Sequence, residues 1–192
     1  MERTVIIIKH DGVARGLMGE IMQRYERVGL KLVAMKLVHA TEEMGHSHYP
    51  DEEAWYTKVG ERSLEEYENK GIDPIAHIGT ADKIEIGKLV KKWNVEYLTE
   101  GPVLAMIFEG YGAIKMGRKI TGETNPSKAV PGTVRGDYTI DNAEVANAKK
   151  RPFRNLIHSS GSDEEAANEI ELWFTPDEIH DYIRADADMM FK

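Results

Sequence analysis

The apolar residues of the chain form two kinds of pattern, short continuous runs and helical spacings. Residues 5–8 and 102–108 are continuous apolar runs, which are typical of strands buried on both faces. Residues 30–37 are rich in Val and Leu with interspersed Lys and predict a further strand, and residues 155–158 predict a short one. The sequence therefore predicts four strands, well separated along the chain.

Helical spacing follows the first and third of these strands. From Val13 to Tyr25 apolar residues recur every three or four positions, which predicts one helix that Gly29 ends. Residues 111–120 predict a helix after the third strand. Gly, Pro, Thr and Asn are then so dense over residues 122–136 that we expect a loop.

Capping patterns predict two helices between the second and third strands. Ser63 with Glu66 is a capping-box pattern that would begin a short helix, and Gly71 would end it. Asp82 would begin another helix that reaches about Trp93. No motif of known chemistry lies between these caps.

The last part of the chain carries two further capping boxes. Ser162 with Glu165 and Thr175 with Glu178 predict two helices, the second of which would carry His180. Strands and helices thus alternate along most of the chain. This order favours an α/β (α+β) fold, a ferredoxin-like βαββαβ sandwich.

The length indicates one domain over residues 1–192 with additions to it. We interpret residues of about 57–97 as a helical insertion at the periphery, and residues of about 139–153 as a second insertion. Two readings of the first insertion stay open. In the first reading the insertion borders a binding cleft or extends a subunit contact. In the second it only stabilises the fold and has neither role.

Composition narrows the class of protein. The chain contains no cysteine, which excludes a disulfide framework or a cysteine-ligated metal site. No apolar run approaches the roughly 20 residues needed to cross a membrane, and residues 5–8 are too short for a signal peptide. We therefore expect a cytoplasmic protein that neither spans nor binds a membrane.

The charge is unevenly distributed. The net charge is −8, which disfavours nonspecific binding of nucleic acid by the whole surface. Residues 115–154, however, carry nine Lys or Arg against four Asp or Glu. A basic segment in an acidic protein indicates either a confined anion site or charges that cluster on a solvated face.

Histidines are the most informative candidates, because the sequence has no P-loop and no G-x-G-x-x-G pattern. For six of the seven histidines we favour a surface or packing role: His10, His39, His46, His48, His77 and His180. His46 and His48 have the spacing of a metal-binding pair, but a clear third ligand is missing, so a metal site is the weaker alternative.

His158 differs from the others in its surroundings. It ends a short apolar strand and precedes a Ser/Gly turn, so its ring would be held rigidly at a cleft. Glu169 on the next helix could accept the proton of one ring nitrogen and leave the other nucleophilic. On this pattern alone, a structural role and a catalytic role remain equally open.

The loop between Arg118 and Arg135 changes that balance. Two Arg and a Thr on a tight Gly- and Pro-rich scaffold suit phosphate oxygens, because guanidinium groups offer forked donors. The alternative is a solvated loop that happens to carry arginines.

Several stretches resemble the nucleoside diphosphate kinase family, in the order in which that family has them. They are residues 8–17 (IKHDGVARGL), 101–103 (GPV), 122–126 (GETNP), 131–137 (PGTVRGD) and 154–160 (RNLIHSS), followed by Glu169 and residues 172–174 (LWF). The resemblance covers both ends and the middle of the chain, and it implies the ferredoxin-like fold and the family's phosphoryl transfer between nucleotides.

The resemblance also implies a role for each matched residue. His158 would be the phosphorylated nucleophile, positioned by Glu169, with Tyr49 beside it and Ser160 in support. The β- and γ-phosphates would be held by Lys9, Arg118, Thr124 and Arg135. Asn155 would hydrogen-bond the ribose hydroxyl.

The remaining implications concern the base, the metal and the assembly. The base would stack on an aromatic side chain, for which Trp55 and Tyr56 both qualify. Mg²⁺ would arrive bound to the nucleotide phosphates and not to protein ligands. The partners would be nucleoside triphosphates and diphosphates, and the chain would form homo-oligomers, either hexamers or tetramers built from a shared dimer.

The sequence departs from the family at two positions near these motifs. His10 stands where Pro is usual, and Gly161 stands where Asp is usual. A catalytically weak relative of the same fold is one alternative, which the intact site residues argue against. A nucleic-acid-binding module is another, based on residues 115–154, and the net acidity and the lack of interleaved aromatic residues disfavour it.

Overall fold

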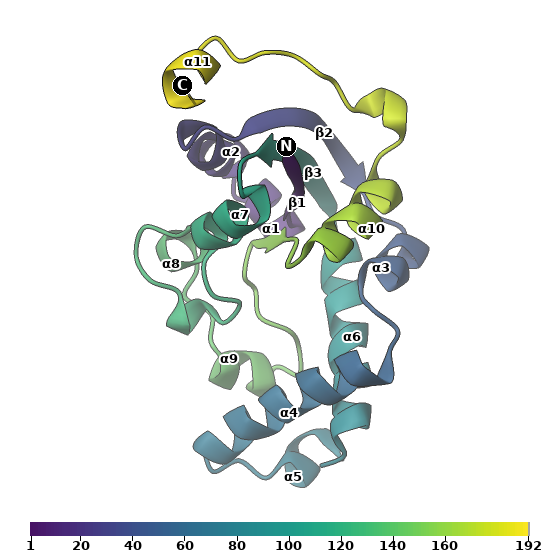
Figure 1. The fold of residues 1–192 in the computed structure, drawn as a ribbon. Helices are drawn as coiled ribbons and strands as arrows, with labels where there is room; N and C mark the ends of the chain where they lie inside the picture. Colours follow the sequence, from purple (N-terminus) through teal and green to yellow (C-terminus); the bar gives the residue numbers. More distant parts are fainter. Residues whose placement is uncertain (192) are drawn as a thin grey trace.

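The computed structural model describes residues 1–191, and its centre is a four-stranded antiparallel sheet (Figure 1). The strands are β1 (Glu2–Ile8), β2 (Lys31–His39), β3 (Pro102–Gly110) and β4 (Ile157–Ser159). Their order across the sheet is β2-β3-β1-β4, which places the first and third strands of the chain in the middle. This arrangement confirms the predicted ferredoxin-like α/β fold.

Helices and short 3₁₀ turns surround the sheet. In chain order they are α1 (His10–Ala14), α2 (Met18–Arg27), α3 (Glu42–His48), α4 (Glu53–Asn69), α5 (Pro74–Ile78), α6 (Lys83–Thr99), α7 (Ala113–Thr121), η1 (Pro126–Lys128), α8 (Val134–Tyr138), α9 (Ala143–Ala148), α10 (Asp163–Trp173), η2 (Pro176–Glu178) and α11 (Ala187–Phe191). No helix among the described residues is long and apolar enough to span a membrane.

The sheet is buried on both faces, as the continuous apolar runs predict. Successive residues of a strand point to opposite faces. Ile6 and Ile8 accordingly pack with residues of α2 and α7, whereas Val5 and Ile7 pack with residues of α3, α6 and α10. All four of these β1 side chains are fully buried.

Three local predictions are wrong. The helix expected from Val13 to Tyr25 is split into α1 and α2, because Gly16 adopts a left-handed φ of 69° between them. Ser63 does not begin a helix; it lies inside α4, and its hydroxyl donates to the Val59 carbonyl at 3.0 Å. His180 lies outside a helix, because η2 ends at Glu178.

Other end signals are confirmed. Gly29 follows α2 with a φ of 94°, and Gly71 follows α4 with a φ of 64°. The Asp82 side chain accepts hydrogen bonds from the backbone of Ile84 and Glu85 at 2.9 Å, and α6 then runs to Thr99. Part of the expected 122–136 loop is ordered as η1 and the start of α8.

The helices α4 and α6 cross in direct backbone contact. A Cβ at Gly60 would lie 1.9 Å from the Lys83 carbonyl oxygen, and one at Gly87 would lie 2.3 Å from that of Tyr56. Glycine at both positions is therefore needed for this approach. In Figure 1 the outer parts of α4 and α5 lie at the end of the molecule away from the sheet, whereas the end of α6 returns to it.

Candidate active site

The strand register directs His158 toward α10. His158 pairs with Ile7, whose face of the sheet carries α10. The Nε2 atom of His158 lies 2.6 Å from the Oε1 atom of Glu169. The other oxygen of this carboxylate accepts a hydrogen bond from the Ser160 hydroxyl at 2.6 Å, and Ser160 in turn is held by the Val5 amide at 2.9 Å. The carboxylate is thus held in place against Nε2, which leaves Nδ1 as the ring nitrogen available for chemistry.

His48 is part of this cluster, although sequence reasoning gave it only a surface or packing role. Its ring is buried 4.4 Å from that of His158, measured between centroids. The indole Nε1 of Trp173 donates to His48 Nδ1 at 3.3 Å. The place of His48 directly before Tyr49 was the signal that could have found it.

The cluster of His48, His158 and Glu169 has the residue types of a metal site, and their ligand atoms lie within 4.8 Å of one another. The Trp173 bond makes a metal ion a poor fit. Because Nδ1 of His48 accepts this bond, the proton of the neutral ring sits on Nε2, and neither nitrogen is then free to bind a metal ion.

Electrostatics keep the imidazole of His158 neutral. Burial lowers the pKa of His158 well below its usual range, and the charges of Lys9, Arg135 and Arg118 lower it further, against an opposing effect of Glu165. Burial conversely raises the pKa of Glu169. A neutral ring keeps the lone pair that a nucleophile needs.

Lys9 and Asn155 form the second part of the site. The ammonium of Lys9 donates to the Asn155 side-chain oxygen at 3.0 Å, and the Asn155 amide nitrogen donates to the Thr124 carbonyl at 3.1 Å. Burial lowers the pKa of Lys9 to about 7, with Arg135 and Arg154 lowering it further and Asp11 raising it. Lys9 is therefore a cation whose charge an incoming anion would stabilise.

Arg135 joins three backbone segments around this site. Its guanidinium donates to the carbonyls of Gly122 at 2.9 Å, Asn155 at 3.3 Å and Ile157 at 2.5 Å. Thr133 caps α8 and so sets the position of Arg135. A guanidinium has five N–H donors, so Arg135 retains donors for an anion after these three bonds.

Arg118 approaches from α7 and is exposed, which places it at the open side of the cluster. A Cβ at Gly161 would lie 3.3 Å from Arg118 Nη1 and 2.5 Å from Glu165 Oε2. The Glu165 carboxylate also accepts the Gly161 amide hydrogen at 2.5 Å. A carboxylate from the first turn of α10 thus fills the space beside residue 161, and a side chain at this position would have to displace the ends of the Glu165 and Arg118 side chains.

The aromatic candidates from the sequence have no described contact with His158 itself. Tyr49 packs edge-on against the His48 ring with the centroids 4.9 Å apart, so it lies one ring away from His158. Trp55 and Tyr56 lie on α4, and their described ring contacts are with each other and with Lys91. Tyr56 is also hydrogen-bonded to Asp51 and buried, whereas Trp55 is only half-buried.

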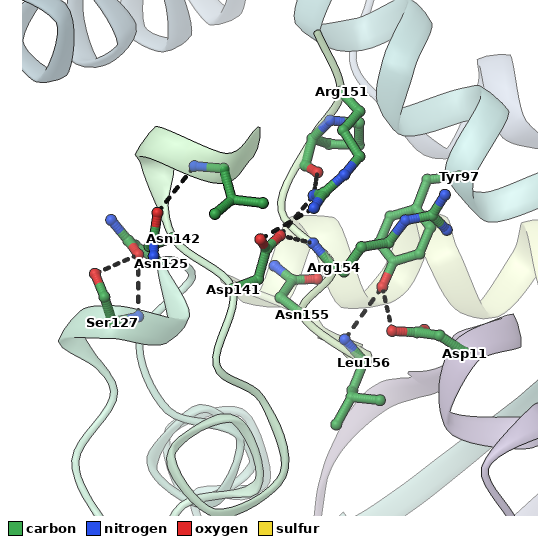
Figure 2. Close-up of polar contacts among 12 residues, drawn as sticks. Asp11, Tyr97, Asn125, Ser127, Asp141, Asn142, Arg151, Arg154, Asn155 and Leu156 are labelled. Carbon is green, nitrogen blue, oxygen red and sulfur yellow. Dashed lines mark hydrogen bonds and ion pairs between the residues drawn. The ribbon is translucent and has the colours of Figure 1, made fainter. Parts of the chain in front are cut away.

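The segment before β4 is anchored on its other side by a carboxylate (Figure 2). Asp141 pairs with the Arg151 guanidinium at 2.6 and 3.1 Å and accepts the Arg154 amide hydrogen at 2.6 Å. Figure 2 also shows two side chains that sequence reasoning missed, Asp11 and Tyr97, next to the same segment. Together these contacts fix the chain that leads to His158.

The arrangement as a whole is a neutral, oriented imidazole beside buried and exposed cations. Such a site can bind a polyanion and attack it with the imidazole nitrogen, because the cations neutralise the negative charge that would repel the nucleophile.

Comparisons with known proteins agree with this chemistry. The family model described as "Nucleoside diphosphate kinase" matches residues 2–59 and 86–179. A nucleoside diphosphate kinase of Pyrobaculum aerophilum is 45% identical over 179 residues, which cover 93% of this chain and 98% of the relative. One from Archaeoglobus fulgidus is 36% identical over 194 residues, covering 100% and 99% of the two chains.

Solved structures give the same result. The crystal structure of an NDP kinase from Pyrobaculum aerophilum superposes with a TM-score of 0.92 at 43% identity, covering 94% of this chain and 99% of the other. A nucleoside-diphosphate kinase from Borrelia burgdorferi, a transition-state mimic with bound vanadate and ADP, gives a TM-score of 0.78 at 31% identity over 98% and 95% of the chains. The chain belongs to the nucleoside diphosphate kinase family, the phosphotransferases that pass a phosphoryl group from a nucleoside triphosphate to a nucleoside diphosphate.

Proposed function

We propose that this chain transfers the γ-phosphate of a nucleoside triphosphate to a nucleoside diphosphate in two steps, through a phosphorylated His158. The observation that carries the proposal is the 2.6 Å contact between His158 Nε2 and Glu169, which leaves Nδ1 to attack. In the first step the Nδ1–phosphorus bond forms as the bond to the leaving nucleoside diphosphate breaks. In the second step the terminal oxygen of another nucleoside diphosphate takes the phosphoryl group and restores the imidazole.

The surrounding residues divide the remaining tasks. Lys9, Arg118 and Arg135 neutralise the β- and γ-phosphates, and the Thr124 hydroxyl adds a short neutral donor. Asn155 hydrogen-bonds the ribose hydroxyl. Its amide nitrogen donates one hydrogen to the Thr124 carbonyl in the structure, which leaves the second hydrogen for the ribose.

Two further residues support His158 itself. Ser160 holds the Glu169 carboxylate, and the ring of Tyr49 packs behind His48. For the base we favour Trp55 over Tyr56, since Tyr56 is buried and bonded to Asp51 whereas the indole of Trp55 is half-buried and open to a partner.

Magnesium enters this scheme with the nucleotide. Among the described residues the group that could hold a metal ion is the His48, His158 and Glu169 cluster, and the hydrogen bond from Trp173 to His48 does not fit that use. We therefore propose that Mg²⁺ is bound by the phosphates of the substrate. We also propose a cytoplasmic homo-oligomer, a hexamer or a tetramer built from dimers.

The covalent intermediate predicts a defined kinetic pattern. Incubation with magnesium ATP should add one phosphoryl group to the protein in mass spectra, and this group should be acid-labile, as phosphohistidine is. Initial rates with ATP and a second nucleoside diphosphate should give parallel double-reciprocal lines, because donor and acceptor never occupy the site together. Intersecting lines and an unmodified protein would instead indicate direct transfer in a ternary complex.

The lowered pKa of Lys9 predicts proton uptake on nucleotide binding. At pH 8 the free Lys9 amine, with a pKa of about 7, is mostly neutral, and bound phosphates raise this pKa because they stabilise the ammonium. Binding of magnesium ADP should then take up close to one proton at pH 8 and almost none at pH 6. Calorimetry in buffers of different ionisation enthalpy measures this number. Lys9→Met should bind ADP more weakly and without the uptake at pH 8; equal uptake in this variant would assign the proton to another group.

The sequence predicts a helical insertion over residues of about 57–97, and we propose a shorter one. The family model leaves out residues 60–85, whereas Ile86, Val95 and Leu98 of α6 are buried. We propose that residues 60–85 are an addition that does not build the catalytic centre. Lys128 next to the phosphate loop pairs with Glu66 of α4 at 2.6 Å, so the addition steadies the edge of that loop.

Excision of this segment tests the proposal. Gly60 and Lys83 are in backbone contact, so a short Gly-Ser linker between residues 59 and 84 can replace the intervening chain without displacing either helix. The shortened protein should still become phosphorylated by magnesium ATP, with a KM for nucleotide raised severalfold. Lys128→Ala in the full chain is the matched control and should give the same rise in KM. A folded shortened protein without any phosphorylation would contradict the proposal.

A further inference from the structure

Tyr97 is a buried side chain that connects the two halves of the site. It lies near the end of α6, and only 2% of its surface is exposed. The Lys9 ammonium lies 4.4 Å from the centroid of its ring, and the Arg154 guanidinium carbon lies 4.6 Å from it. One aromatic ring therefore contacts both cations, and the attraction is strong because the Lys9 contact is buried.

The hydroxyl of Tyr97 makes two further contacts, both drawn in Figure 2. It donates to Asp11 Oδ2 at 2.9 Å and accepts the Leu156 amide hydrogen at 3.2 Å. Asp11 is the carboxylate that raises the pKa of Lys9. The hydroxyl thus orients the negative charge that favours the protonated form of Lys9.

The Leu156 contact reaches the nucleophile from the other side. Leu156 has a φ of 63°, which is the left-handed region that a branched residue rarely adopts. Its amide is bonded to Tyr97, its carbonyl accepts the Lys9 amide hydrogen at 2.7 Å, and His158 follows two residues later. The Tyr97 hydroxyl therefore satisfies a buried N–H at the unusual turn that directs β4.

We propose that Tyr97 is a positioning residue for phosphoryl transfer: its ring holds the charged Lys9 ammonium, and its hydroxyl holds the Leu156 turn that orients His158. This inference rests on the proposed function of Lys9 and His158. The two roles use different parts of one side chain, so two substitutions separate them. Tyr97→Phe removes the hydroxyl and keeps the ring, whereas Tyr97→Leu removes both.

The ring is expected to act through the charge of Lys9. Without it the ammonium loses a favourable contact, so its pKa falls and the neutral amine becomes dominant at lower pH. The basic limb of the pH profile of kcat/KM should therefore move to lower pH by about half a unit to one unit in Tyr97→Leu. Relative to Tyr97→Phe, the loss of the ring should lower activity further by roughly three- to tenfold at pH 8, and by less than about twofold at pH 6, where at least about half of the Lys9 amine is protonated in both proteins.

The hydroxyl is expected to act through His158. Tyr97→Phe keeps the ring under Lys9 and the charge of Asp11, so the basic limb should move much less than in Tyr97→Leu. The buried Leu156 N–H loses its acceptor, and the single-turnover rate of His158 phosphorylation by magnesium ATP should fall about three- to tenfold at every pH, with the KM for nucleotide nearly unchanged.

Tyr67 provides the matched control, because it is also 2% exposed and lies on α4, where its ring packs against His77. Tyr67→Leu and Tyr67→Phe should lower the melting temperature about as much as the corresponding Tyr97 variants do. They should leave the basic limb of the pH profile and the phosphorylation rate as in the wild type. If the Tyr67 and Tyr97 variants behave alike, the role of Tyr97 is general stability and the proposal is overturned.

The outcomes also separate this proposal from the one on which it rests. A wild-type protein that is not phosphorylated by magnesium ATP refutes the proposed function. A wild-type protein that is phosphorylated, together with Tyr97 variants of unchanged rate and pH limb, refutes the role of Tyr97 alone. If Tyr97→Leu does not fold, Tyr97→Phe decides: a rate loss at all pH values supports the proposal, and a wild-type rate overturns it.

Discussion

Replacing His158 with alanine is expected to lower nucleotide-dependent phosphoryl transfer by roughly 10³-fold or more, as the loss of a covalent nucleophile does in other enzymes. The protein should remain folded, because the ring of His158 is only one member of a well-packed cluster and its backbone bonds to β1 are kept. The measurement is conversion of GDP to GTP by ATP, together with the melting temperature and the mass of the protein after incubation with magnesium ATP.

The matched control for this substitution is His46→Ala. His46 lies on α3, is exposed, and pairs only loosely with Glu42 at 3.9 Å. This variant should keep full activity and the phosphoryl adduct. Substantial activity in His158→Ala, or an adduct that persists without His158, would assign the nucleophile to another residue, for which the buried His48 is the nearest candidate.

The sheet could be predicted from the sequence because its strands are marked by local composition. Residues 5–8 and 102–108 are apolar without interruption, and their position between two helical layers buries the side chains of residues 5–8 and 103–108. The split at Gly16 could not be predicted in the same way. Apolar spacing continues across it, so the periodicity gives no sign of the left-handed φ that Gly16 adopts after α1.

Ser63 shows a different limit of local patterns. Ser followed by Glu three residues later is a capping box only if the helix begins there, and the same spacing occurs inside helices. In α4 the Ser63 hydroxyl bonds back to Val59, because the helix begins ten residues earlier, at Glu53. That beginning has no side-chain cap, so the sequence offered no signal for it.

Residues of the candidate site could be predicted from the sequence where they belong to a recognisable motif. Residues that join the site only through tertiary contacts could not. His158, Lys9 and Arg135 belong to stretches that resemble a known family. Tyr97 and His48 reach the same cluster from helices that are distant in sequence, and both contribute by packing against a charged or nucleophilic group. His48 was marked only by its place directly before Tyr49, and nothing in the sequence around Tyr97 distinguishes its contacts from ordinary core packing.

The two arginines of the site are expected to respond differently to substitution by lysine, and this comparison separates binding from structure. Arg135 is buried and bonds three carbonyls of different segments, while Arg118 is exposed on α7. A lysine at position 135 keeps the charge but cannot reach all three carbonyls with one ammonium. Two buried carbonyls then lose their donors, which costs on the order of 2–4 kcal/mol.

A loss of this size should lower the melting temperature of Arg135→Lys by roughly 5–15 °C, since about 1 kcal/mol shifts a chain of this length by about 2–4 °C. Arg118→Lys should melt within about 2 °C of the wild type, because surface substitutions change stability by only about 0.5 kcal/mol. Both variants should lose phosphoryl transfer by about tenfold or more, since lysine cannot grip a phosphate with a forked pair of donors. Equal melting temperatures for the two variants would show that the three carbonyl bonds of Arg135 contribute little to the fold. A stable, fully active Arg118→Lys would show that the forked donors of Arg118 are not needed and that its positive charge alone suffices, because a single ammonium would then serve as well as its guanidinium.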